Sequence, residues 1–159
     1  MDRDAADLPA VDLFVTTADA VLQTPIMMVN TVLSLMAVEY PAHKLACYVS
    51  DDGCSPIILY SLVEASKFAR LWVPFCKKYD VQVRAPFRYF SGDAAFPPSD
   101  DGKKSPEFHL EWKKIKEEYE NMRQKIEAAA SGTVQIECCG DYAAFANTTK
   151  TDHPTIIKV

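Results

Sequence analysis

Two adjacent aspartates followed by a glycine, Asp51-Asp52-Gly53, carry the strongest chemical signal in this sequence. They follow an apolar run and precede a helix pattern that begins at Ser55-Pro56. Ligands of an open parallel sheet bind beyond the carboxyl ends of its strands, so acids placed there can face a base, a ribose or a metal ion that holds phosphates. The alternative is a plain Asp-Gly turn, because both residues tolerate turn geometry. The residues alone leave both interpretations open.

A second polar segment, Thr16-Thr17-Ala18-Asp19, follows the first apolar run in the same way. The two strand ends are neighbours if the unit is a right-handed crossover. Thr16, Asp19 and Asp52 would then line one crevice. The alternative is a solvated loop in which the Asp19 side chain makes a local turn.

Residues that could hold a metal or act as nucleophiles form no recognisable pattern elsewhere. His43, His109 and His153 are scattered, and Cys138-Cys139 is a vicinal pair with no partner at the spacing of a zinc site. We therefore predict no metal site in this chain. The five cysteines are odd in number and include no CxxC pair, which indicates a reduced, cytosol-facing chain and not a disulfide scaffold.

The elements that must position these residues follow from the apolar patterns. Strands are predicted at residues 11–16, 44–50 and 81–84, and helices at residues 26–38 and from residue 56 onward, with a further turn or two over residues 73–79. The crossovers are long enough to force parallel pairing. The predicted fold class is α/β, the front half of a doubly wound nucleotide-binding sheet.

The second half of the chain changes character. Residues 85–106 are rich in proline and glycine and predict a loop or linker. Residues 107–130 predict a long helix with a heptad seam, in which a packing role is favoured over a cofactor site. The seam residues are Phe108, Trp112, Ile115, Tyr119, Met122 and Ile126. A strand is predicted to begin at residues 155–159.

Composition and charge restrict the class of protein. The chain has 159 residues, 48% hydrophobic and 25% charged, which suits one folded domain and excludes intrinsic disorder for most of its length. The net charge of −5 argues against binding to nucleic acid. The longest uncharged run, residues 20–38, contains Gln23, Pro25 and Asn30, so we expect a loop and a buried helix there and no membrane span.

Several strings together resemble the plant cellulose synthases, over nearly the whole chain. They are Val11-Asp12-Leu13-Phe14-Val15-Thr16-Thr17-Ala18-Asp19, Asn30-Thr31-Val32-Leu33-Ser34-Leu35, Leu45-Ala46-Cys47-Tyr48-Val49-Ser50-Asp51-Asp52-Gly53, Phe68-Ala69-Arg70-Leu71-Trp72-Val73-Pro74-Phe75-Cys76-Lys77-Lys78 and Asp152-His153-Pro154. The Thr-Thr-Ala-Asp sequence and Phe87-Arg88-Tyr89-Phe90 look more like the cellulose synthase-like branches.

The resemblance implies a membrane-embedded, processive, inverting glycosyltransferase whose cytosolic catalytic domain has a GT-A-like, nucleotide-sugar-binding fold. It implies a UDP-sugar donor such as UDP-glucose, a glucan acceptor, and a β-linked cell-wall polysaccharide of the cellulose or hemicellulose type. Mg²⁺ or Mn²⁺ is the expected cofactor of the full enzyme, and the Golgi or the plasma membrane its expected location.

Site roles are implied residue by residue. Asp52 corresponds to the family's first catalytic-site aspartate, which contacts the donor nucleotide; Asp51 adjoins it. Thr16 stands where the family has a Ser or Thr at the donor pocket, and Gln23 where it has a donor-contacting Glu, so the charge at that position is lost. Asp19 joins them as a further donor-site candidate.

The resemblance also implies domain boundaries and a limit to activity. We expect residues 1–84 to form half of the glycosyltransferase domain, 85–106 a linker, 107–152 a plant-specific helical insertion, and 153–159 a return to the catalytic sheet. By this resemblance the chain ends before the family's metal-binding Asp-x-Asp, its Thr-Glu-Asp general base and its Gln-x-x-Arg-Trp acceptor motif. We therefore expect a fragment that is inactive alone. The rival hypothesis is a non-catalytic assembly module, with homo-oligomerisation through residues 107–130 left open.

Overall fold

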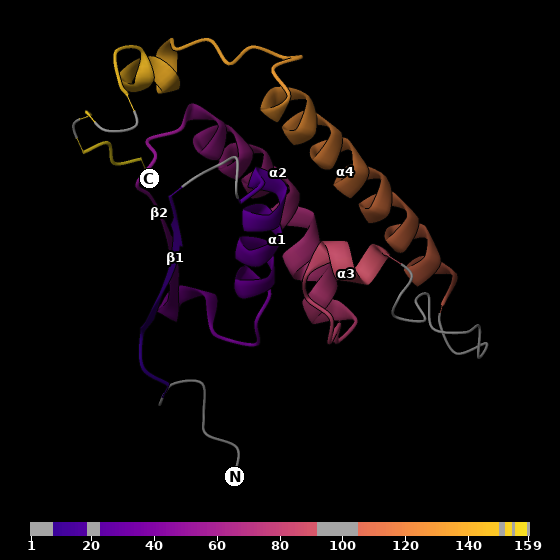
Figure 1. Ribbon diagram of the computed structural model, residues 1–159. Helices are drawn as coiled ribbons and strands as arrows, with labels where there is room; N and C mark the ends of the chain where they lie inside the picture. Colours follow the sequence, from indigo (N-terminus) through magenta and orange to yellow (C-terminus); the bar gives the residue numbers. More distant parts are fainter. Residues whose placement is uncertain (1–7, 19–22, 92–104, 150–151, 154, 159) are drawn as a thin grey trace.

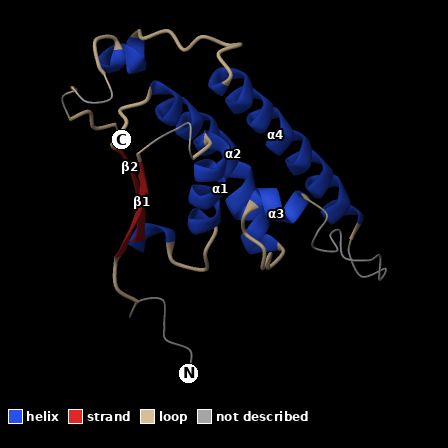
Figure 2. Ribbon diagram, in the orientation of Figure 1, coloured by secondary structure: helices blue, strands red, loops and turns tan. Residues whose placement is uncertain are grey.

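The computed structural model describes residues 8–18, 23–91, 105–149, 152–153 and 155–158. Strands and helices alternate through the first half of the chain, and helices dominate the second (Figures 1 and 2). In chain order the elements are β1 (Val11–Thr17), α1 (Pro25–Met36), η2 (Ala42–Lys44), β2 (Leu45–Asp51), α2 (Pro56–Lys78), α3 (Pro86–Phe90), α4 (Pro106–Ala130) and η3 (Gly140–Phe145).

The two strands β1 and β2 form a parallel sheet, as predicted. Their register runs from Val11 opposite Leu45 to Thr17 opposite Asp51. The intervening helix α1 provides the crossover that parallel pairing needs. The predicted α/β class is therefore confirmed at the level of two parallel strands with several helices.

The prediction of a third strand at residues 81–84 is wrong. Asp80 adopts a left-handed backbone conformation, with φ of 46°, and turns the chain back toward α2. The Val81 amide then donates to the Cys76 carbonyl over 2.9 Å, and the Arg84 carbonyl accepts from Trp72 Nε1 over 2.9 Å. These contacts hold the segment against the end of α2, away from the sheet edge.

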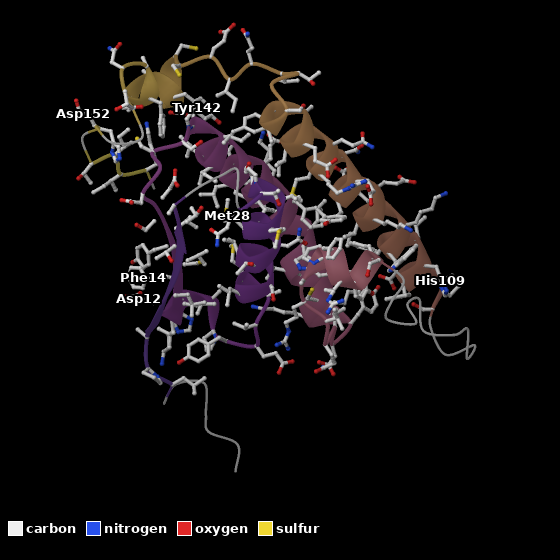
Figure 3. The ribbon with its side chains drawn as sticks, in the orientation of Figure 1. Asp12, Phe14, Met28, His109, Tyr142 and Asp152 are labelled. Atoms are coloured by element: carbon white, nitrogen blue, oxygen red, sulfur yellow. The ribbon has the colours of Figure 1, made fainter. Side chains whose placement is uncertain are left out.

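The helices lie on one side of the sheet, which leaves its other face open (Figures 1 and 3). Alternation along β1 follows from this arrangement, because Asp12, Phe14 and Thr16 are exposed whereas Leu13 and Val15 are half-buried. Phe14 stacks on Tyr48 of β2 across the open face, with ring centroids 5.1 Å apart.

The core lies between the helices, where α2 packs against both α1 and α4. Trp72 of α2 is fully buried among aromatic rings and contacts Tyr89 of α3 with a centroid separation of 5.3 Å. The side chain of Asn30 ties three elements together. Its Oδ1 accepts from the Phe87 amide over 2.7 Å, and its Nδ2 lies 3.3 Å from the Tyr119 hydroxyl.

The predicted long helix is confirmed as α4, and its apolar seam packs against other helices of the same chain. The seam side chains pack in the core formed with α1 and α2, and all but the half-buried Trp112 are buried. An assembly that used this seam would first have to separate α4 from α2. The seam therefore lends no support to homo-oligomerisation through residues 107–130.

Three further segments differ from the predicted elements. The helix predicted from residue 56 and the further turns predicted over residues 73–79 form one continuous helix, α2, which runs through Pro74, whose ring is exposed. Helix α3 forms within the segment predicted as a loop, at Pro86–Phe90. The expected strand at residues 155–159 is not formed over its described part, 155–158, and η3 has no counterpart in the sequence prediction.

A buried carboxylate joins α2 to α4. Glu64 is 7% exposed and pairs with Lys67 of its own helix and with Lys125 of α4, the latter at 3.1 Å. Burial raises the pKa of Glu64, but the hydrogen bonds and charges of both lysines outweigh burial and hold this pKa below its usual value. The pair thus stabilises the fold above the ordinary glutamate pKa of ~4.3, and this contribution is lost as pH falls through the lower folded-state pKa.

We expect Glu64→Gln to lower the free energy of unfolding by about 1 kcal/mol at neutral pH, because both lysines lose a charged acceptor. The difference from the parent should be smaller at a pH below the ordinary glutamate pKa of ~4.3 than at neutral pH. Urea unfolding followed by circular dichroism measures both. Glu118→Gln, at an exposed site of α4, is the control. A Glu64→Gln effect no larger than the control's, or equal at both pH values, would contradict the prediction.

Candidate functional site

The carboxyl ends of β1 and β2 meet, as expected for adjacent parallel strands. Thr16 pairs with Ser50 in the register, and Thr17 with Asp51. Beyond the last pair, the Asp52 amide donates to the Thr17 carbonyl over 2.9 Å. The two polar segments that the sequence singled out are thus brought together, and Asp52 is tied to the end of β1.

The two aspartates have different environments. The half-buried Asp51 carboxylate accepts hydrogen bonds from the Gly53 amide over 3.3 Å and the Ser55 amide over 2.6 Å. The second of these satisfies a backbone donor at the start of α2, where Ser55 makes no side-chain cap of its own. Asp51 therefore shapes the loop between β2 and α2. Asp52 is exposed, so its side chain is open to solvent.

The loop between β2 and α2 is tightly built around Gly53 and Cys54. A side-chain carbon at Gly53 would lie 2.9 Å from the Ala18 carbonyl oxygen, which is closer than real contacts allow. Cys54 adopts a φ of 46°, a left-handed conformation that costs a non-glycine residue about 1–2 kcal/mol. Strained backbone of this kind clusters at ligand-binding loops, where the surrounding structure maintains it.

We expect Gly53→Ala to lower the free energy of unfolding by about 1–3 kcal/mol, as at other overpacked sites, because the methyl group forces the loop away from β1. Urea unfolding followed by circular dichroism measures the effect. Parent-like stability of the variant would show that the close approach of Gly53 to Ala18 does not matter.

The other sequence-predicted site residues are placed as follows. Thr16 is exposed at the end of β1, and Gln23 is exposed two residues before α1. Asp19 lies outside the described residues. Thr17 is only 4% exposed, and within the described part of the chain its hydroxyl has no hydrogen-bond partner. The structure thus brings Thr16 close to the Asp52 loop and makes no described contact between Gln23 and that loop.

His153 is a residue that sequence reasoning dismissed as scattered. Its Nε2 lies 3.4 Å from the Asp52 carbonyl oxygen, although the two residues are 101 positions apart. Sequence spacing contains no signal for such a contact. Its occurrence in the string Asp152-His153-Pro154, one of those that resemble the cellulose synthases, was the only available hint.

A divalent cation fits these residues poorly. No group of three or more His, Cys, Asp or Glu side chains that could hold a metal ion occurs in the described ranges. The Asp51 carboxylate already accepts two backbone hydrogen bonds, so among the described residues at the strand ends Asp52 has the one carboxylate left open to solvent. We therefore derive no chemical step through a metal ion from this part of the protein.

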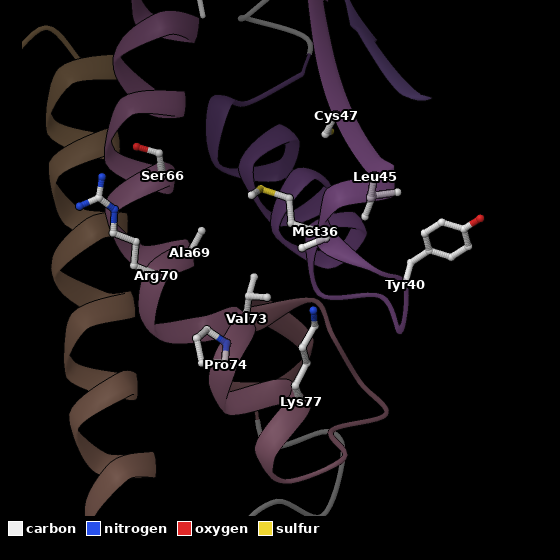
Figure 4. A pocket seen from close by; sticks show the side chains of 11 residues that line it. Met36, Tyr40, Leu45, Cys47, Ser66, Ala69, Arg70, Val73, Pro74 and Lys77 are labelled. Atoms are coloured by element: carbon white, nitrogen blue, oxygen red, sulfur yellow. The ribbon is translucent and has the colours of Figure 1, made fainter. Parts of the chain in front are cut away.

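A cavity of about 400 Å³ lies at the other end of the sheet, where β2 begins (Figure 4). Its walls come from the end of α1, the start of β2 and the middle of α2: Met36, Tyr40, Ala42, Leu45, Cys47, Ser66, Ala69, Arg70, Val73, Pro74 and Lys77. Burial raises the pKa of the Cys47 thiol, which makes it a poor nucleophile at neutral pH. The cavity is mostly apolar and separate from Asp52, so the candidate site stays at the carboxyl ends of the strands.

Comparisons with known proteins assign the chain to a family. The family model described as "Cellulose synthase" matches residues 11–159. Cellulose synthase-like proteins B4 and B1 of Arabidopsis thaliana are each 54% identical over 159 residues, and cellulose synthase-like protein H1 of Oryza sativa subsp. japonica is 54% identical over 155 residues. These alignments cover 100%, 100% and 96% of this chain, but only 20% of each relative. The chain belongs to the cellulose synthase family.

Proposed function

We propose that this segment forms the first half of the nucleotide-sugar donor site of a processive, inverting glycosyltransferase. The observation that carries the proposal is the exposed Asp52 carboxylate, held at the carboxyl ends of two parallel strands in a chain of the cellulose synthase family. Ligands of open parallel sheets bind at that edge. The donor is a UDP-sugar, and the product is a β-linked polysaccharide of the cell-wall type.

Each residue of this site has a different proposed role, which follows from its surroundings. Asp52 contacts the donor nucleotide as an acceptor of its hydrogen bonds, since an ionised carboxylate can only accept. Asp51 holds the loop through its bonds to the amides of Gly53 and Ser55. Thr16 supplies a hydroxyl at the end of β1, and Gln23 an amide at the entrance to α1. Asp19 remains a proposed donor contact.

We extend the proposal to the architecture of the parent protein. The two-stranded sheet and its helices are the front part of a GT-A-like domain over residues 1–84, residues 107–152 are a helical insertion, and residues 153–159 lead back to the catalytic sheet. The contact of His153 with Asp52 supports this return. The described part of this chain contains no helix long and apolar enough to cross a membrane. The proposed location is the Golgi or the plasma membrane, with this segment facing the cytosol.

Sugar transfer by the full-length protein tests the proposal. Microsomes that express it are supplied in turn with UDP-glucose, UDP-galactose, UDP-xylose and UDP-glucuronic acid, each with Mg²⁺ or Mn²⁺, and the released UDP and the insoluble polymer are measured. We expect one donor to give polymer with β-linkages and UDP release above that of microsomes lacking the protein. Release at the background level for every donor, from protein shown to be folded, would contradict the proposal.

A further inference from the structure

The chain leads away from the candidate site along α4, and the residues after α4 return to it. Figure 1 shows η3 near the start of α2 and the C-terminal residues beside the end of β2, and Figure 3 places Tyr142 and Asp152 in this region. Burial raises the pKa of Tyr142 of η3, and the charges of Tyr60 and Glu64 of α2 add to the rise. The segment after η3 thus reaches the loop that holds Asp52.

Two hydrogen bonds join Thr149 and Asp152 just before His153. The Thr149 amide donates to the Asp152 carbonyl over 3.1 Å, and the Asp152 amide donates to the Thr149 hydroxyl over 3.0 Å. These reciprocal bonds hold Asp152, the residue before His153, against Thr149.

His153 then meets the backbone of Asp52. A carbonyl oxygen can only accept, so the 3.4 Å contact between His153 Nε2 and the Asp52 carbonyl is a hydrogen bond when Nε2 carries a proton. The amide of the same residue donates to the Thr17 carbonyl over 2.9 Å. The backbone of Asp52 is therefore held from both sides, by β1 through its amide and by the returning segment through its carbonyl, while its side chain stays exposed.

We propose that His153 is a positioning residue of the donor site, which orients the Asp52 carboxylate by holding the Asp52 carbonyl. The inference rests on the proposed function, in which Asp52 contacts the donor nucleotide. His153 itself touches no donor in this arrangement. Its loss should weaken donor binding by letting the loop relax, and any other side chain that presents an N–H at the position of Nε2 should replace it.

The variants His153→Ala, His153→Gln and His153→Asn of the full-length protein test this inference, with His43→Ala, at an exposed histidine, as the control. Glutamine can present an amide N–H near the position of Nε2, whereas the shorter asparagine cannot reach it. We expect His153→Ala and His153→Asn to raise the KM for the UDP-sugar about threefold to tenfold, the range of one lost hydrogen bond. The kcat should change less than twofold, because a contact made equally in the ground and transition states affects KM alone. His153→Gln and His43→Ala should resemble the parent.

A second measurement covers the case in which His153→Ala does not accumulate. The dissociation constant for UDP, measured on detergent-solubilised His153→Gln and His153→Asn proteins, should be parent-like for glutamine and raised for asparagine. Equal affinities of these two variants, or a parent-like KM for His153→Ala, would overturn the inference. The proposed function stands in that event if Asp52→Asn still lowers donor turnover about tenfold or more, whereas a harmless Asp52→Asn would overturn both.

Discussion

Replacing Asp52 by asparagine is expected to lower donor turnover by the full-length protein about tenfold to a hundredfold. The substitution keeps the size of the side chain but removes the charge, and a positioned hydrogen bond to a charged group contributes ~1.5–3 kcal/mol. The amide of Asp52 still donates to Thr17, and the side chain is exposed, so the fold should be unaffected. Sugar transfer from the UDP-sugar by microsomes with matched protein levels is the measurement.

Asp51→Asn is the matched control, because it changes the neighbouring carboxylate in the same way. Asp51 uses both oxygens on backbone amides, and asparagine keeps only one acceptor. We expect a loss of about 1 kcal/mol in stability and a smaller loss of turnover than for Asp52→Asn. If Asp52→Asn retained turnover within twofold of the parent, Asp52 would be an ordinary solvated turn residue, for which changes stay within ~0.5 kcal/mol.

Trp72→Ala is expected to destabilise the chain by about 3–5 kcal/mol, the range observed when a buried aromatic side chain is truncated. Trp72 is fully buried and stacks on Phe68 and Phe75 of α2, with centroids 6.1 Å and 6.0 Å away. It also packs against Tyr89 and Phe90 of α3. Because domains have only about 5–15 kcal/mol of stability in total, the loss should be evident in urea unfolding monitored by far-UV circular dichroism.

Two tryptophan-to-phenylalanine changes separate packing from hydrogen bonding. Trp72→Phe keeps an aromatic ring but loses the bond to the Arg84 carbonyl, so we expect about 1–2 kcal/mol of destabilisation. Trp112→Phe also makes the ring smaller, but loss of its N–H should change stability by less than ~0.5 kcal/mol. The buried Trp112 N–H has no hydrogen-bond partner within the described residues. Equal losses of stability for the two changes would mean that the hydrogen bond from Trp72 to the Arg84 carbonyl does not stabilise the segment that follows α2.

The amino-acid sequence by itself determined β1, β2, the long helix α4 and the family. The β-branched and aromatic runs indicated both strands within one residue of their ends, and the step of three and four residues indicated α4. These patterns are local, because burial of one face imposes a period on the chain whatever packs against it. The position of Asp51-Asp52-Gly53 between a strand and a helix was likewise available from neighbouring residues.

Only the tertiary structure decided how those elements are used. Residues 81–84 have strand-like side chains, yet the left-handed Asp80 and the bond from Trp72 direct them onto α2. The heptad seam of α4 has the pattern of an assembly surface, yet α1 and α2 bury it within the chain. Asp51 and Asp52 are identical residues side by side, and they differ because the Asp51 carboxylate meets two amides that the loop turns toward it. His153 reaches Asp52 across 101 residues, and such contacts depend on the path of the whole chain, which no local period encodes.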